Sequence, residues 1–281
     1  MKTKYIISAL LAAGLATAAH AGGVVGDLIV GFAQSGTTTN YELDLGSVGS
    51  YQGLGVDSVV NLSSNLSALD LSSTFGSTWA SAGTVTLGSV ATNGSTTLPG
   101  ITGPAKSDWV SQSDGTVTAQ PWMSETPEAS TYKDPNGTAN ANSRELAIQN
   151  VENGLNSVNG FTQSSNVSST AGFISTTAAD SWSHYLGIAN GFTVPAIDSG
   201  TNLSLSSGMF QVLDIYQYIQ ASNTTTPGTY LGSLELGSDG SLFFTNFDPI
   251  AIPEPSVYAA ILGAATLAFV AIRRRKQQIL A

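Results

Sequence analysis

The sequence of 281 residues contains no cysteine. Disulfide bonds therefore cannot stabilise its fold, and catalysis that pairs a cysteine with a histidine is excluded. The two histidines, His20 and His184, lie far apart in the chain, which also excludes the H-E-x-x-H zinc motif. Stability must come from an ordinary apolar core, and a chain of this length can build one.

Basic residues are scarce away from the two termini. Between Gly22 and Ile252 there are only Lys106, Lys133 and Arg144, against 18 acidic residues, which gives a formal charge of −15. Nucleic acid and anionic lipid surfaces attract basic proteins and repel acidic ones. We therefore expect no nucleic-acid partner.

The N-terminus has the three parts of a secretory signal peptide. Lys2 and Lys4 precede a mostly apolar stretch from Tyr5 to Ala18, and Ala19-His20-Ala21 supplies the small-x-small pattern that signal peptidase reads. The alternative is a buried N-terminal helix, but the apolar stretch has no polar face. The pattern predicts a signal peptide over residues 1–21, with Gly22 opening the exported chain.

The C-terminus has the pattern of a membrane-inserted segment. From Val257 to Ile272 no residue is charged. As a helix this run reaches about 24 Å at about 1.5 Å per residue, slightly less than the roughly 30 Å core of a bilayer. The basic cluster that follows should stay on the cytoplasmic side; it consists of Arg273, Arg274, Arg275 and Lys276. The pattern predicts at least transient insertion into a membrane.

Pro253, Glu254 and Pro255 directly precede this apolar run. The order of Pro-Glu-Pro, apolar helix and arginine cluster resembles the PEP-CTERM sorting signal of Gram-negative bacteria that carry an exosortase. The resemblance covers residues 253–281. It implies that a membrane-embedded exosortase-like enzyme cuts near the motif and that the protein reaches the cell surface or extracellular polysaccharide matrix. A permanent membrane anchor is the alternative.

The region between the two signals, residues 22–252, is rich in Ser, Thr, Gly and Asn, as expected for short strands joined by polar turns. It predicts a mainly β fold, namely a single antiparallel β-sandwich-like domain with two short helices. The expected strands are Val24–Phe32, Thr39–Leu45, Phe210–Ile219, Thr229–Leu236 and Ser241–Phe247. Loop Gln34–Thr38 and turn Gly237–Gly240 should each close a hairpin. The last hairpin also resembles the segment that precedes the tail in many PEP-CTERM proteins.

Two segments have helical spacing of apolar residues. The first is expected to begin at Asp57 as N-cap, and its apolar stripe is Val59, Leu62, Leu66 and Leu69. The second is expected to begin at a capping box formed by Asn142 and Glu145, followed by a stripe of Ile148, Val151, Leu155 and Val158. Both helices should cover an open end or a face of the sheet.

Few residues could carry catalysis. His184 has Ser183 and Asp180 nearby in the sequence, but no G-x-S-x-G elbow accompanies them, which favours a packed or surface histidine. Glu125 and Glu128 lie in a loop with flanking prolines, so a glycoside hydrolase with two carboxylates is only a minor alternative. We expect that the protein is not an enzyme and binds no cofactor.

One loop has the oxygen spacing of an EF-hand. Its candidate calcium ligands are Asp134, Asn136, Thr138, Asn140, Asn142 and Glu145. The sharp turn of such a loop needs glycine at its sixth position, where Ala139 stands. An Asn/Gly-rich loop that ends in a helix cap explains the same residues, and we therefore expect no metal site.

Trp109 and Trp122 flank polar loop sequence. If exposed, their rings could stack on sugars, which would indicate a noncatalytic carbohydrate-binding protein with extracellular polysaccharide as its partner. The alternative is that they anchor the core together with Trp79 and Trp182. Taken with the export signals, the composition favours a structural or adhesive protein of the cell envelope or extracellular matrix.

Overall fold

The computed structural model describes residues 24–118, 137–155, 160–167, 170–186, 201–219 and 228–246. The predicted signal peptide and the predicted sorting tail lie outside these residues. Among the described residues, no helix is both long enough and apolar enough to cross a bilayer.

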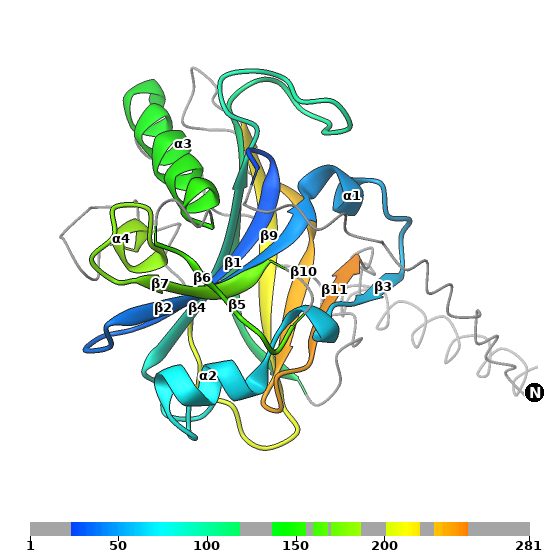
Figure 1. The fold of residues 1–281 in the computed structure, drawn as a ribbon. Coiled ribbons are helices and arrows are strands. Elements are labelled where there is room, and N and C mark those ends of the chain that lie inside the picture. The colour runs from blue at the N-terminus through cyan, green and yellow to red at the C-terminus, as the bar shows by residue number, and fades with distance from the viewer. Residues whose placement is uncertain are drawn as a thin grey trace, which may run out of the picture. The chain divides into compact units, whose positions relative to one another are not determined.

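The described strands form one antiparallel sheet of 11 strands that curls into a half-barrel (Figure 1). The strands are β1 (Asp27–Gln34), β2 (Thr39–Ser47), β3 (Ser58–Asn61), β4 (Val85–Thr92), β5 (Ser107–Thr118), β6 (Thr162–Gln163), β7 (Ala171–Ser175), β8 (Thr201–Asn202), β9 (Phe210–Ile219), β10 (Thr229–Gly237) and β11 (Leu242–Asn246). Their order is β3-β11-β10-β9-β5-β4-β1-β2-β7-β6, and β8 pairs with β4. The mainly β prediction is confirmed, but the strands form one continuous curled sheet instead of the two packed sheets of a sandwich.

Four α-helices accompany the sheet in the described residues, where two short helices were expected. They are α1 (Val48–Gln52), α2 (Ala68–Phe75), α3 (Gly137–Gly154) and α4 (Trp182–Tyr185). Residues of α2 pack into the core inside the curl, whereas α3 and α4 pack on the opposite face of the sheet (Figure 1).

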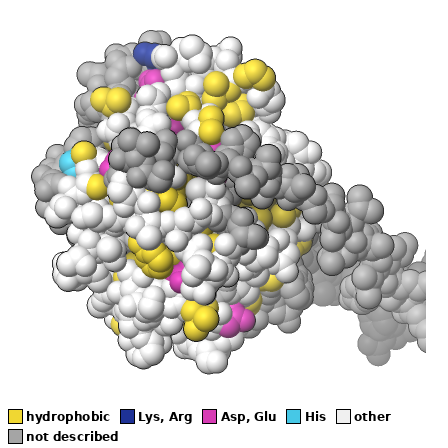
Figure 2. Space-filling view, viewed as in Figure 1, with side chains coloured by type: hydrophobic (Ala, Val, Ile, Leu, Met, Phe, Trp, Pro, Cys, Tyr) yellow, Lys and Arg dark blue, Asp and Glu magenta, His cyan; other side chains and the backbone are white. Residues whose placement is uncertain are grey.

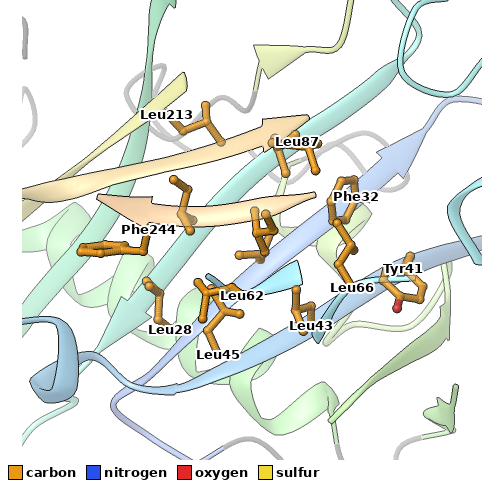
Figure 3. Packing of buried hydrophobic residues seen from close by; sticks show 14 of the residues in the cluster. Leu28, Phe32, Tyr41, Leu43, Leu45, Leu62, Leu66, Leu87, Leu213 and Phe244 are labelled. Atoms are coloured by element: carbon orange, nitrogen blue, oxygen red, sulfur yellow. The ribbon is translucent and has the colours of Figure 1, made fainter. Parts of the chain in front are cut away.

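The inner core lies inside the curl of the sheet. Figure 3 shows side chains of β1, β2, β4, β9 and β11 pointing toward one another, together with Leu62 and Leu66 from the segment between β3 and α2. Tyr41, Leu43 and Leu45 are all buried there, as the alternation along β2 predicted. Alternate strand residues point to one face, so a curled sheet brings many such faces together around one core.

The strand predictions near both ends of the domain are confirmed with small shifts. β1 and β2 form the expected antiparallel hairpin, with Ile29 opposite Asp44 and Phe32 opposite Tyr41. β9 has the predicted bounds, and β10 and β11 pair across the expected glycine turn. Strong β-branched and aromatic content made these segments predictable.

The helix expected from Asp57 is wrong. Val59 and Val60 belong to β3, which pairs with β11, and a 3-10 turn (Ser63–Asn65) follows. Asp57 has a positive φ of 61° and does not cap a helix. The helix α2 begins later, where the Ser67 hydroxyl accepts a hydrogen bond from the Asp70 amide. Pairing with β11 outweighed the weak helical spacing of the apolar residues.

The second predicted helix exists, but it is longer than expected. α3 begins at Gly137, so Asn142 lies inside the helix and is not its cap. Ile148, Val151 and Leu155 are buried against the sheet, as the spacing predicted. Val158 lies outside the described residues.

Candidate functional site

A cluster of buried polar side chains lies where α4 packs on β2. We call it the Asn40 cluster, and its members are Asn40, Glu42, Trp182 and Ser183; each is at most 1% exposed. Asn40 and Glu42 alternate with the core residues of β2 and therefore point to the face that α3 and α4 cover. Polar groups in such a place need partners, because unpaired burial is costly.

Glycine at position 31 makes room for this arrangement. Gly31 of β1 lies opposite Glu42 in the sheet register. A Cβ atom at Gly31 would overlap the indole of Trp182, so the indole lies directly over this glycine. The Trp182 ring also stacks on Tyr185, with centroids 5.1 Å apart. The Glu42 side chain, opposite this glycine, is 0% exposed.

Glu42 is fully buried and anchors α4 to the sheet. Its Oε1 accepts a hydrogen bond of 2.6 Å from the Trp182 amide, while its Oε2 has no hydrogen-bond partner. Burial raises the pKa of Glu42 to about 8; the Trp182 amide opposes this rise and the charge of Asp180 adds to it. A carboxyl with this pKa is mostly protonated at neutral pH, so it can carry a proton.

Ser183 and Asn40 form the second contact of the cluster. The Ser183 hydroxyl donates to the Asn40 Oδ1 over 2.5 Å. The Asn40 Nδ2 has no hydrogen-bond partner, and neither has the indole Nε1 of Trp182. A buried amide that leaves its donor unused is unusual in a folded protein.

The serine of the possible Ser-His-Asp triad, Ser183, belongs to the Asn40 cluster. The one hydroxyl proton of Ser183 is engaged with Asn40 and is therefore not available to His184 in this arrangement. The backbone amide of His184 donates to the Ser181 hydroxyl, which caps α4. Asp180 lies close enough to Glu42 to raise its pKa. Around Ser183 the structure thus brings together a serine, an amide and a protonated carboxyl.

A second buried carboxyl, Glu152, ties α3 to the sheet. Its Oε1 accepts hydrogen bonds from the amides of Gly26 (3.3 Å) and Thr92 (3.0 Å), and its Oε2 has no partner. Burial raises the pKa of Glu152 well above its usual range, and the charges of Asp27 and Asp108 add to the rise. The Thr92 hydroxyl donates to Asp108 over 2.7 Å. Within the part of the chain that the structure describes, no group of three His, Cys, Asp or Glu side chains is arranged to hold a metal.

The same face carries two further carboxylates on β9 and β10. The Ser233 hydroxyl donates to Asp214 over 2.6 Å, and the Thr245 hydroxyl donates to Glu235 over 2.8 Å. Asp214 and Glu235 are both buried. These two bonds come from hydroxyl groups of neighbouring strands and link the strands side by side, and Asp214 also accepts a bond of 3.4 Å from Tyr216 on its own strand. The surface in Figure 2 consists mostly of neutral polar and backbone atoms, with scattered charged side chains.

Trp109 is completely buried in the inner core. The prediction that it could stack on a sugar is therefore wrong, because stacking needs an exposed ring face. Trp79 and Trp182 are buried as well. Trp122, the other candidate, lies outside the described residues, as do Glu125 and Glu128.

The EF-hand-like segment is largely helical where the structure describes it. Thr138, Asn140 and Glu145 belong to α3. Successive helical residues turn by about 100°, whereas an EF-hand loop wraps its ligands around one ion. The Glu145 carboxylate accepts a hydrogen bond of 3.3 Å from Gln149 within the same helix. Asp134 and Asn136 lie outside the described residues.

The remaining predicted sites also lie outside the described residues: Ala19, Ala21, Pro253, Glu254, Pro255, Arg273, Arg274, Arg275 and Lys276. The sequence interpretation missed the roles of Asn40 and Glu42. Their signal was the polar half of the alternation in TNYELDL, since a strand covered on both faces buries its polar half too. No protein-family model matches the chain, and no match was found among curated proteins or solved structures.

Proposed function

We propose that the chain is an exported structural or adhesive protein of the cell envelope or extracellular matrix. The observation that carries this proposal is the C-terminal order of Pro253-Glu254-Pro255, apolar run and RRRK, preceded at the other end by a signal-peptide pattern. In this proposal signal peptidase removes residues 1–21. An exosortase-like enzyme then processes the inserted segment 253–281.

The described domain has structural features that can stabilise an exported protein without disulfide bonds. Its 11 strands share one sheet, so most of them are hydrogen-bonded to a neighbour on both sides. Buried carboxyls bind backbone amides of distant segments, as Glu152 does at Gly26 and Thr92. Such contacts support a rigid scaffold, which is what a structural or adhesive role requires.

The acidic charge restricts the partners that we propose. A formal charge of −15 over residues 22–252 disfavours nucleic acid and leaves neutral or cation-bridged polysaccharide as the matrix component in contact. Carbohydrate binding through an aromatic platform now depends on Trp122, since Trp109 is buried. The membrane is a transient partner in this scheme.

Two tail variants in an exosortase-bearing host test the proposal. Glu254→Ala should leave the apolar run inserted but uncut, because the features that govern insertion are unchanged. Deleting Arg273 to Lys276 should let the tail be translocated across the membrane before it is processed, because the basic cluster that resists translocation is missing. We expect both variants to accumulate as precursor or to be lost from the surface, as measured by cell fractionation and immunoblotting.

Wild type is the reference in the same experiment, and Glu128→Ala, more than a hundred residues before the tail in the sequence, is a charge-matched control. Equal amounts of full-length wild type and both tail variants in the inner membrane would mean that the tail is a plain anchor. The sorting proposal would then be wrong.

A further inference from the structure

We propose that Ser183 and Asn40 react within the folded chain to form an ester cross-link between α4 and β2, with Glu42 as the proton-transfer group. The bond would join the Ser183 Oγ to the Asn40 Cγ and release ammonia. It would be a covalent tie in a chain that has no cysteine. The inference rests on the Asn40 cluster and does not depend on export.

The two reacting groups are already in contact. The Ser183 Oγ lies 2.5 Å from the Asn40 Oδ1, at the short end of hydrogen-bond distances. A hydroxyl this close to the amide oxygen is also near the amide carbon, to which that oxygen is bonded. Both side chains are buried, at 1% and 0% exposed, so the contact is held by packing. Positioning of this kind is a main source of rate in intramolecular reactions.

The amide nitrogen of Asn40 is suited to leave. Its Nδ2 has no hydrogen-bond partner, although it is buried. No bond from the surrounding protein therefore has to be broken when this nitrogen departs. In most folded proteins a buried amide is held by hydrogen bonds to both its oxygen and its nitrogen.

Glu42 lies beside the reacting pair. It is two residues from Asn40 on the same face of β2. Its Oε1 accepts a hydrogen bond from the Trp182 amide, and Asn40 accepts one from the Ser183 hydroxyl. The two β2 side chains therefore contact consecutive residues of α4. Glu42 Oε2 and Asn40 Nδ2 both have no hydrogen-bond partner, so a rotation of one side chain is what brings them together for proton exchange.

The protonation state of Glu42 suits this role. Burial raises its pKa to about 8, and the nearby charge of Asp180 contributes to the rise. At neutral pH the carboxyl therefore holds a proton that it can give to a leaving nitrogen. The aromatic rings of Trp182 and Tyr185, stacked 5.1 Å apart, shield the site from water that would hydrolyse an ester.

The reaction balances without an oxidant or a cofactor. The Ser183 Oγ attacks the Asn40 Cγ and forms the new C–O bond. The hydroxyl proton moves along the existing hydrogen bond to Oδ1 and from there to the Glu42 carboxyl, which gives its own proton to Nδ2. The C–N bond then breaks, and ammonia leaves with both amide hydrogens and the proton from Glu42, which keeps the former hydroxyl proton. Protonation of the released ammonia in bulk water draws the exchange forward.

The cross-link would have a structural effect like that of a long-range disulfide. Residues 40 and 183 are 143 positions apart in the sequence. Joining them would remove many conformations from the unfolded chain, and this effect grows with the size of the closed loop. It would also hold α4 on the sheet by a bond that reducing agents cannot break.

Peptide mapping of the purified full-length chain tests the proposal. We expect tandem mass spectrometry to find a linked pair of peptides that contain Asn40 and Ser183, lighter than their sum by one ammonia. Hydroxylamine should cleave this pair, because it attacks esters. Absence of the linked pair in wild type after incubation in the folded state would overturn the proposal.

Two variants separate the ester from other losses of ammonia. Asn40 could instead cyclise on its own backbone to a succinimide, which loses the same mass but does not need Ser183. In Ser183→Ala both the loss and the link should disappear, and a loss that persists there would overturn the proposal. Glu42→Gln keeps the side-chain volume and should slow cross-linking about 100-fold or more. An unchanged rate would exclude Glu42 as the proton-transfer group.

Discussion

Glu42 couples the stability of the folded chain to pH. Its pKa rises from the usual 4.5 to about 8 on folding, because burial penalises the charged form. Between these values the folded state binds more protons than the unfolded state, so the free energy of unfolding falls as pH rises. The stabilisation is complete below about pH 4.5 and is lost through pH 8. Glu152 has a raised pKa as well and acts in the same direction.

We predict that the chain is more stable at pH 5 than at pH 8, and that Glu42→Gln reduces this slope by up to about 1.4 kcal/mol per pH unit. Urea unfolding at several pH values measures this slope for the protein with Glu42 and for Glu42→Gln. Both carry Ser183→Ala, so that no cross-link contributes. Asp239→Asn is the control. Bonds from Ser241 lower the pKa of Asp239, so it is already ionised in this range and its removal should leave the slope unchanged.

Gly31 is required because the Trp182 indole occupies the space of a side chain. We predict that Gly31→Ala destabilises the fold by about 1–3 kcal/mol through overpacking. Gly55→Ala is the matched control: the new Cβ would meet only Ser58 Oγ, at 3.8 Å, and stability should change by less than about 0.5 kcal/mol. Thermal unfolding of both variants measures the difference. Equal stability of the two would mean that α4 does not pack tightly over β1.

At the scale of elements, the strands with strong local patterns were predictable and those defined by their neighbours were not. β9, for example, could be predicted because FQVLDIYQYI is rich in β-branched and aromatic residues. The short β3 could not, because its Val59 and Val60 also fit a helical stripe, and only pairing with β11 decides between the two. The start of α3 was misplaced because a capping-box pattern at Asn142 occurs inside a longer helix.

The observed start of α2 gives a prediction at this scale. The Ser67 hydroxyl accepts a bond of 3.1 Å from the Asp70 amide, which satisfies one free donor of the first turn. Ser67→Ala should therefore cost about 1 kcal/mol of stability. Ser64→Ala, at an exposed position of the preceding 3-10 turn, should cost less than about 0.5 kcal/mol. Equal losses in chemical unfolding would contradict the assignment of Ser67 as the cap.

At the scale of the whole molecule, the candidate site could not be predicted from the sequence. Asn40 and Ser183 are separated by 143 positions and meet only because α4 packs on β2. The serine itself was noticed, through its neighbour His184, but its partner was not. Local motifs predict local structure and signals at the chain ends. Contacts between distant segments depend on the register of the sheet, which a single sequence does not specify.

The central claim is that the chain is exported and processed at both ends. Mass-spectrometric mapping of the termini of protein recovered from the cell surface or matrix tests it most directly. We predict a mature N-terminus at Gly22, because Ala19 and Ala21 fit the subsites of signal peptidase. We also predict a C-terminus near Pro253–Pro255, with the basic cluster absent. A chain that retains Met1 and ends at Ala281 in its final location would contradict the account.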